Sequence, residues 1–60
     1  MRPTALLKQA VLSGNRFEGI VYGHRRLPDG KPIQTSRVRA IISDGVTHLA
    51  VTRNTIYILA

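Results

Sequence analysis

The chain lacks cysteine altogether and has only three acidic side chains among its 60 residues. Without cysteine, neither a disulfide nor a thiolate zinc site can form. Two of the acids, Asp29 and Asp44, belong to turn sequences, so with Glu18 they make no carboxylate pair for acid–base catalysis. His24 and His48 lack the further ligands that a metal site requires, and no glycine-rich phosphate loop is present. We therefore expect a non-catalytic protein without catalytic residues, metal or cofactor.

Long apolar runs are missing too. The first residues, MRPTALLKQAVLSG, contain a short apolar stretch that Lys8 and Gln9 interrupt. That stretch is too short and too polar for a secretory signal or a membrane-spanning helix. The absence of cysteine agrees with a reducing compartment. We expect a cytoplasmic protein that does not contact membranes.

The length allows one small domain. Folding a chain of this size buries only roughly 60% of the surface that its unfolded form exposes. Small domains therefore often add disulfides, a structural metal or oligomerisation. Because the sequence supports neither of the first two, self-association is the remaining source of stability, and we predict that the protein can form homo-oligomers.

Positive charge is what the chain has in excess. Nine Lys and Arg face three Asp and Glu, which gives a net charge of +6 and an isoelectric point near 11.3. Seven of the nine bases are arginine, whose planar guanidinium group suits phosphate and stacks on bases. Such an excess attracts polyanions, and nucleic acid, DNA or RNA, is the commonest polyanion in a cell. Many small proteins are basic without a specific ligand, however, so charge alone does not decide the function.

The N-terminal segment predicts a short helix over about 4–13. Thr4 is a suitable N-cap and is followed by good helix formers. Gly14 stands where a glycine commonly ends a helix. The apolar residues have the spacing of one helix face: Leu7, Ala10 and Val11. A helix of this length is unstable alone, so we expect it to cover the core.

From residue 16 onward the sequence predicts β-structure. Three turn signals, Pro28-Asp29-Gly30, Asp44-Gly45 and Arg53-Asn54, separate four runs of β-forming residues. The prediction is an antiparallel four-stranded meander over about 16–59, and together with the helix an α+β fold. If the last two turns each have two-residue loops, the following pairs face each other: Val38 and Val51, Ala40 and Leu49, Ile42 and Thr47, Leu49 and Ile58, Val51 and Ile56.

This register sorts the side chains onto two faces. One face is aliphatic and is the predicted core: Val38, Ala40, Ile42, Leu49, Val51, Ile56 and Ile58. The other face carries Arg37, Arg39, His48, Thr52, Thr55 and Tyr57. Phe17, Val21 and Ile41 also fall on this second face, which makes it mixed rather than polar. A sheet curled into a partial barrel, or a dimer that covers the mixed face, would explain the mixture, and both alternatives stay open.

Two groups of basic residues are candidate nucleic-acid-binding sites. Arg37, Arg39, His48 and Tyr57 on one sheet face suggest a stacking platform for single-stranded nucleic acid. Arg25, Arg26 and Lys31 surround the 27–30 turn beside His24 and could contact backbone phosphate. The first group is also what an ordinary solvated sheet face looks like. The second is also typical of a charged hairpin tip that discourages edge pairing.

The mixed face supports a competing hypothesis. If Phe17, Val21 and Ile41 form an exposed apolar patch, the protein is a protein-binding module, such as a phage-type inhibitor or a homo-oligomeric structural protein. Either hypothesis requires a partner, nucleic acid in the first case and protein in the second.

A combination of short motifs extends over about two-thirds of the chain. Residues 19–24 (GIVYGH), 27–30 (LPDG), 35–36 (TS) and 52–59 (TRNTIYIL) follow the pattern G-x-x-x-x-H…PDG…TS…TRN-x-x-Y-x-L. The pattern resembles short uncharacterised proteins of bacteriophages and prophages. The resemblance implies a bacterial or phage cytoplasm and a small regulatory or accessory protein, and it assigns no role to any residue.

Overall fold

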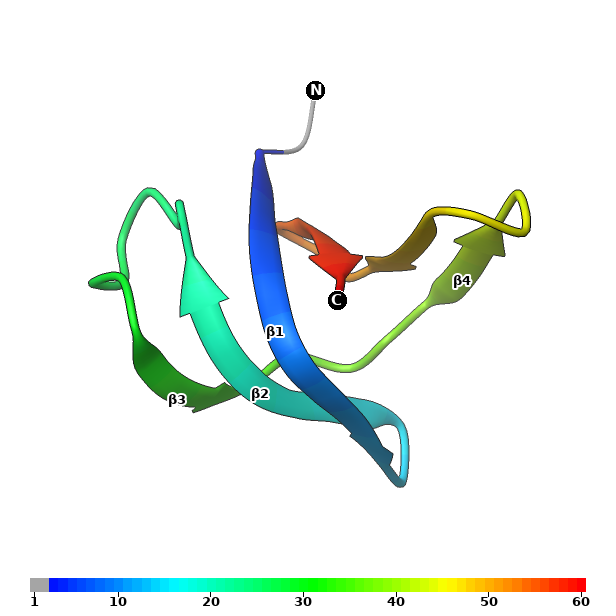
Figure 1. The fold of residues 1–60 in the computed structure, drawn as a ribbon. Coiled ribbons are helices and arrows are strands. Elements are labelled where there is room, and N and C mark those ends of the chain that lie inside the picture. Colours follow the sequence, from blue (N-terminus) through cyan, green and yellow to red (C-terminus); the bar gives the residue numbers. More distant parts are fainter. Residues whose placement is uncertain (1–2) are drawn as a thin grey trace.

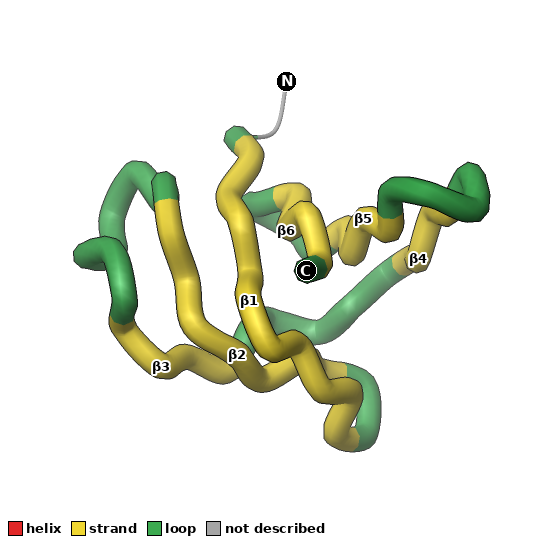
Figure 2. Tube along the Cα trace, in the orientation of Figure 1, coloured by secondary structure: helices red, strands yellow, loops and turns green. Residues whose placement is uncertain are grey.

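The computed structural model describes residues 3–60, and this part of the chain is all β (Figures 1 and 2). Six strands form a single sheet: β1 (Thr4–Ser13), β2 (Arg16–Tyr22), β3 (Lys31–Gln34), β4 (Ala40–Ser43), β5 (His48–Val51) and β6 (Ile56–Leu59). Residues 3–60 contain no helix. The predicted α+β class and four-stranded meander are therefore wrong.

The sheet is made of two antiparallel three-stranded meanders that meet at a parallel pair. The strand order is β3-β2-β1-β6-β5-β4, and only β1 and β6 run parallel. Figure 1 shows the segment between β3 and β4 passing beneath the sheet from one half to the other. Its Thr35 N–H donates to Phe17 O (2.8 Å), and its Arg39 N–H donates to Val51 O (2.8 Å). The sheet is strongly curled, but its outermost strands β3 and β4 do not pair, so within residues 3–60 no barrel closes.

The predicted helix over about 4–13 is strand β1. Ala5 and Leu7 are buried while Thr4 and Lys8 are exposed, the alternation of a strand rather than the spacing of a helix face. β1 occupies the middle of the sheet and pairs with β2 on one side and β6 on the other. Helix propensities differ by less than about 1 kcal/mol per residue, so pairing on both sides outweighs them here.

A bulge bends β1, which pairs with both β2 and β6. The register against β2 shifts by one residue after Lys8, and Gln9 takes a positive φ of 55°. The Gln9 N–H donates to Ala60 O (3.0 Å), which extends the ladder with β6. Gly19 lies opposite the bend, where a Cβ atom would sit 2.7 Å from Lys8 O and 2.9 Å from Leu7 Cγ. The bend therefore requires glycine at this position.

The core is small and lies on one side of the sheet, which we call the inner face. Its buried apolar residues are Ala5, Leu7, Phe17, Val21, Ala50 and Tyr57. The crossing segment covers part of it, since Val38 packs against this cluster. Buried Thr35 accepts a hydrogen bond from Phe17 N–H (3.0 Å) and donates one to Ser36 O (2.8 Å). A hydroxyl thus satisfies backbone groups that the crossing segment would otherwise leave unpaired.

The predicted register is confirmed at one hairpin and wrong at the other. Leu49 faces Ile58 between β5 and β6 as predicted. In the β4–β5 hairpin, Ile42 faces Leu49 rather than Thr47. The reason is a longer loop, in which Asp44 Oδ1 accepts hydrogen bonds from the N–H groups of Val46 (2.9 Å) and Thr47 (2.7 Å). A shift of two residues does not change which side chains of β4 and β5 share a face.

The assignment of the two faces is reversed. Ala50 and Tyr57, together with Thr52 and Thr55, lie on the buried inner face. Most of the aliphatic residues predicted as core lie on the opposite side, which we call the outer face, and Ile42 is 55% exposed. The N-terminal half is responsible, because β1 and β2 add Leu7, Val21 and Phe17 to the inner face. Their bulk fits against small Ala50, so the core forms on that side.

Candidate nucleic-acid interface

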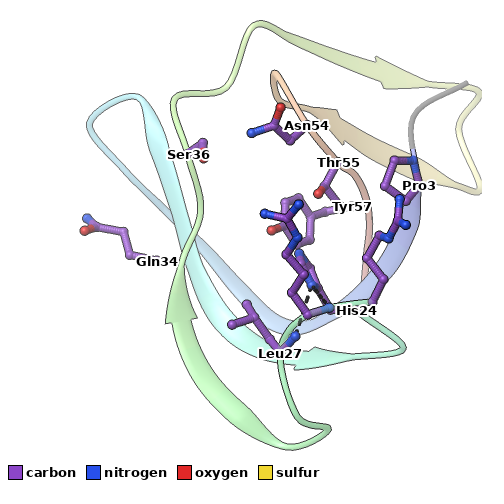
Figure 3. Close-up of a pocket in the computed structure, with 10 residues that line it drawn as sticks. Pro3, His24, Leu27, Gln34, Ser36, Asn54, Thr55 and Tyr57 are labelled. Carbon is purple, nitrogen blue, oxygen red and sulfur yellow. Dashed lines mark hydrogen bonds between the residues drawn. The ribbon is translucent and has the colours of Figure 1, made fainter.

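A pocket of about 440 Å³ opens where the β2–β3 loop meets the β5–β6 turn (Figure 3). The loop supplies residues 24–27 and the turn supplies Asn54 and Thr55. Tyr57 of β6 lies toward the middle of the pocket in Figure 3, next to His24. The full lining is Pro3, His24, Arg25, Arg26, Leu27, Gln34, Ser36, Asn54, Thr55 and Tyr57. No acidic side chain belongs to this set.

His24 stacks on Tyr57 and is held in a fixed orientation. The two ring centroids are 6.2 Å apart and the ring planes differ by 27°. His24 Nδ1 accepts hydrogen bonds from the N–H groups of Arg26 (3.0 Å) and Leu27 (3.3 Å). An accepting Nδ1 carries no proton, so the neutral ring has its proton on Nε2. The backbone of the loop thus orients the imidazole of His24. The same loop places Arg25 and Arg26 directly after it in sequence.

The β2–β3 loop is closed by its predicted turn. Asp29 Oδ1 accepts a hydrogen bond from Gly23 N–H (2.8 Å), and the Gly30 N–H donates to Val21 O (2.7 Å). Gly23 and Gly30 both have positive φ, 71° and 82°, which glycine adopts without strain. Asp29 is therefore engaged with the backbone, which keeps the loop folded back toward the pocket.

Tyr57 supports the pocket from below. Its side chain is only 5% exposed, and burial raises the pKa of its phenol, with a hydrogen bond to Thr55 acting in the opposite direction. The phenol therefore stays neutral at physiological pH. Because Tyr57 is buried beneath His24, the ring that an incoming ligand can reach is the partly exposed imidazole.

The structure brings some of the predicted site residues together and separates others. Arg25, Arg26 and Tyr57 line one pocket, although they came from two different predicted groups. Arg37 and Arg39 are exposed on the segment between β3 and β4 and do not line it. The remaining two predicted residues, His48 and Lys31, are exposed on β5 and β3.

The predicted register also places Arg39 opposite Ala50, and Ala50 opposite Tyr57. Ile41 takes the place of Arg39 opposite Ala50, because the β4–β5 loop is longer than expected. His48 Nδ1 lies 2.7 Å from Ser43 Oγ, at the hairpin end away from Val51. Of the four residues of the predicted platform, His48 and Tyr57 lie on strands β5 and β6, and Arg37 and Arg39 lie on the segment between β3 and β4.

The stacking of His24 on Tyr57 was not predicted from the sequence. The signal that could have found His24 is local: a histidine followed by two arginines, just before a strong turn. The contact with Tyr57 has no local signal. It depends on β6 lying beside β1, which brings residues far apart in sequence to the same side of the sheet.

The described residues contain neither a cluster of metal-ligating side chains nor a membrane-spanning helix. Among residues 3–60 there is no group of three or more His, Cys, Asp or Glu side chains that could hold a metal ion. In the same range, the structure has no helix of the length and apolar character needed to cross a membrane.

The comparisons with known proteins give no family. No family model matches the chain, and no curated protein or solved structure matches it either. The resemblance to phage and prophage proteins therefore stays a prediction.

Proposed function

We propose that the protein is a non-catalytic, weakly specific nucleic-acid-binding protein of the cytoplasm. The observation that carries the proposal is the pocket in which Arg25 and Arg26 flank a stacked His24–Tyr57 pair. Arginine contacts phosphate, and an aromatic ring stacks on a base, so the two features suit the two parts of a nucleotide. The absence of cysteine supports the location.

Electrostatics supports the phosphate contact. The chain carries a net charge of +6, and the pocket lining adds two exposed arginines and no acid. The nearest carboxylate in sequence, Asp29, accepts a hydrogen bond from Gly23 N–H. The guanidinium groups of Arg25 and Arg26 are thus available for a polyanion, and neutralising its phosphates releases counterions.

The geometry favours an unpaired base on His24. The imidazole is partly exposed, backed by Tyr57, and held by two backbone hydrogen bonds, so little side-chain freedom is lost on binding. Stacking of a base on an aromatic ring contributes about 1–3 kcal/mol and is tolerant of sequence. A volume of about 440 Å³ lies within the usual range for small ligands. We therefore propose single-stranded DNA or RNA as the ligand.

Titration of labelled single-stranded DNA and RNA by fluorescence anisotropy, at several salt concentrations, tests the proposal. Replacing Arg25 and Arg26 together by alanine should weaken binding and reduce the salt slope by roughly 1.4, since each phosphate contact to a single strand contributes about 0.7. His24→Ala should weaken binding by up to roughly 1–3 kcal/mol with little change in the salt slope.

The matched control is Lys8→Ala. Lys8 is exposed on β1, its ammonium lies 5.1 Å from the centre of the Tyr22 ring, and it does not line the pocket. The proposal fails if no binding is measurable at low salt. It also fails if the double arginine variant weakens binding no more than Lys8→Ala for each charge removed, because the attraction would then come from net charge and not from the pocket.

The competing proposal is a protein-binding module, in the form of a phage-type inhibitor or a homo-oligomeric structural protein. The patch of Phe17, Val21 and Ile41 gives it little support, because Phe17 and Val21 are buried and only Ile41 is exposed. A different surface favours it: the exposed aliphatic side chains Ile42 (55%) and Ile58 (37%) on the outer face. Apolar surface of this kind is typical of contact sites between proteins.

A further inference from the structure

The two outermost strands of the sheet differ in how they are protected. β3 contains Pro32 and Lys31, and proline and lysine are residues that discourage pairing with another strand. β4 contains neither: its sequence is Ala-Ile-Ile-Ser, and all four residues are exposed. Ile41 is 53% exposed and Ile42 is 55% exposed. β4 is therefore an apolar edge strand that is short but contains no residue that discourages pairing with another strand.

The hydrogen bonds of the hairpin identify which backbone groups of β4 face outward. Asp44 N–H donates to Thr47 O (3.3 Å), and Ile42 lies opposite Leu49 in the same register. Antiparallel ladders alternate between bonded and non-bonded pairs, so Ile42 bonds to β5 in the same way as Asp44. The residues between, Ile41 and Ser43, direct their N–H and C=O groups away from β5. No strand within residues 3–60 pairs with that side of β4.

We propose that β4 pairs antiparallel with β4 of a second copy of this chain, about a two-fold axis at Ile42. In this register, Ile41 of each copy lies opposite Ser43 of the other, and the four outward groups of each strand are all used. Shifting the axis to Ile41 would require the Arg39 N–H, which already donates to Val51 O (2.8 Å). Compared with that register, the one centred on Ile42 leaves none of the outward groups of Ile41 and Ser43 unpaired.

Side chains in this register complement each other. On the outer face, Ile42 continues a row with Leu49 and Ile58, which would extend from one copy to the next. At the ends of the paired strands, Asp44 of one copy lies opposite Ala40 of the other, one position from its exposed Arg39. A negative charge near a positive one at each end of the contact reduces the repulsion between two chains of net charge +6.

The contact between two β4 strands would be small. A strand of four residues covers less than the roughly 800 Å² per partner that standard interfaces bury. The whole described surface is 4203 Å², so a contact of standard size would occupy about a fifth of it. We expect a weak, concentration-dependent dimer. It would stabilise a chain in which the buried apolar core within residues 3–60 comprises six residues, two of them alanine.

Analytical ultracentrifugation over a wide concentration range tests this inference, with NMR to locate the contact. The protein should dimerise as concentration rises, and the amide signals of Ile41 and Ser43 should shift most. Ile42→Lys places like charges directly opposite each other at the axis and should weaken the dimer more than about tenfold. Ile58→Lys, a matched change on the same face two strands away, should weaken it much less.

A backbone variant separates edge pairing from face packing. Ile41→Pro removes one outward N–H from each copy and no bond to β5, so it should weaken the dimer more than about tenfold while the monomer stays folded. A protein that is monomeric at every concentration overturns the inference. A dimer that responds equally to Ile42→Lys and Ile58→Lys also overturns it, since the contact would then be the outer face. Neither result depends on whether nucleic acid binds the pocket.

Discussion

The two halves of the sheet differ in the length of their strands and in the side chains that they contribute to the core. The N-terminal half has the long strands β1 and β2, of 10 and 7 residues, and contributes the bulky core side chains Leu7, Val21 and Phe17. In the C-terminal half every strand has four residues, and its buried core residues are Ala50 and Tyr57. The first half therefore decides which side of the whole sheet is buried. The second half has the open edge β4, and both halves contribute residues to the pocket.

Removing a core side chain from the N-terminal half should have the largest effect on stability. Leu7 is fully buried, so Leu7→Ala should lower the free energy of unfolding by about 2–5 kcal/mol. This loss is a large part of the total stability of a small domain. Urea denaturation followed by circular dichroism measures the change. Leu49→Ala is the matched control, because Leu49 lies half-buried on the outer face of the C-terminal half. Equal losses for the two variants would contradict the contrast between the halves.

Straightening the bend in β1 should have the next largest effect. A methyl group at position 19 would meet Lys8 O at 2.7 Å and Leu7 Cγ at 2.9 Å, and one of these atoms belongs to the backbone. Gly19→Ala should therefore lower the free energy of unfolding by about 1–3 kcal/mol. Thermal or urea denaturation measures it. Gly14→Ala controls for glycine itself, because nothing lies within 4 Å of the added methyl group there, although its φ of 63° brings its own strain. A stabilised Gly19→Ala protein would show that the bend is not needed.

The smallest effect concerns the turn of the C-terminal half and depends on pH. Hydrogen bonds from the N–H groups of Thr47 and Val46 lower the pKa of Asp44 below its usual 3.8. The stabilisation is fully present above that value and is lost as the pH falls through the lower pKa of the folded state. Denaturation of wild type and Asp44→Asn at a series of pH values should give a stability difference at neutral pH that shrinks in acid. A difference independent of pH would contradict the role of the carboxylate.

Local features of the chain were predictable and long-range ones were not. The β5–β6 register is confirmed because residues close in sequence set it, with Leu49 and Val51 facing Ile58 and Ile56. The turn at 28–30 forms as its proline and glycine predict. The prediction of a helix over about 4–13 is wrong. Helix propensity reflects only local preference, and β1 is fixed by pairing with β2 and β6 on its two sides.

The candidate site divides in the same way. Arg25 and Arg26 could be grouped with His24 from sequence, since they are consecutive and precede a turn. Their meeting with Tyr57 could not, because it requires β6 to lie parallel to β1 and the β2–β3 loop to fold back toward it. Arg37 and Arg39 were assigned to a strand, whereas they lie on the crossing segment that joins the two halves.

Several features can be read directly from the sequence: the basic charge, the lack of cysteine, the turns and the alternation of apolar residues in the C-terminal half. Alternation specifies that two faces differ, but it does not state which of them is buried. The tertiary structure decided that, because burial depends on which face receives Leu7, Val21 and Phe17 from the other half of the sheet. It also decided the partners of Arg25 and Arg26 and left β4 open at the edge.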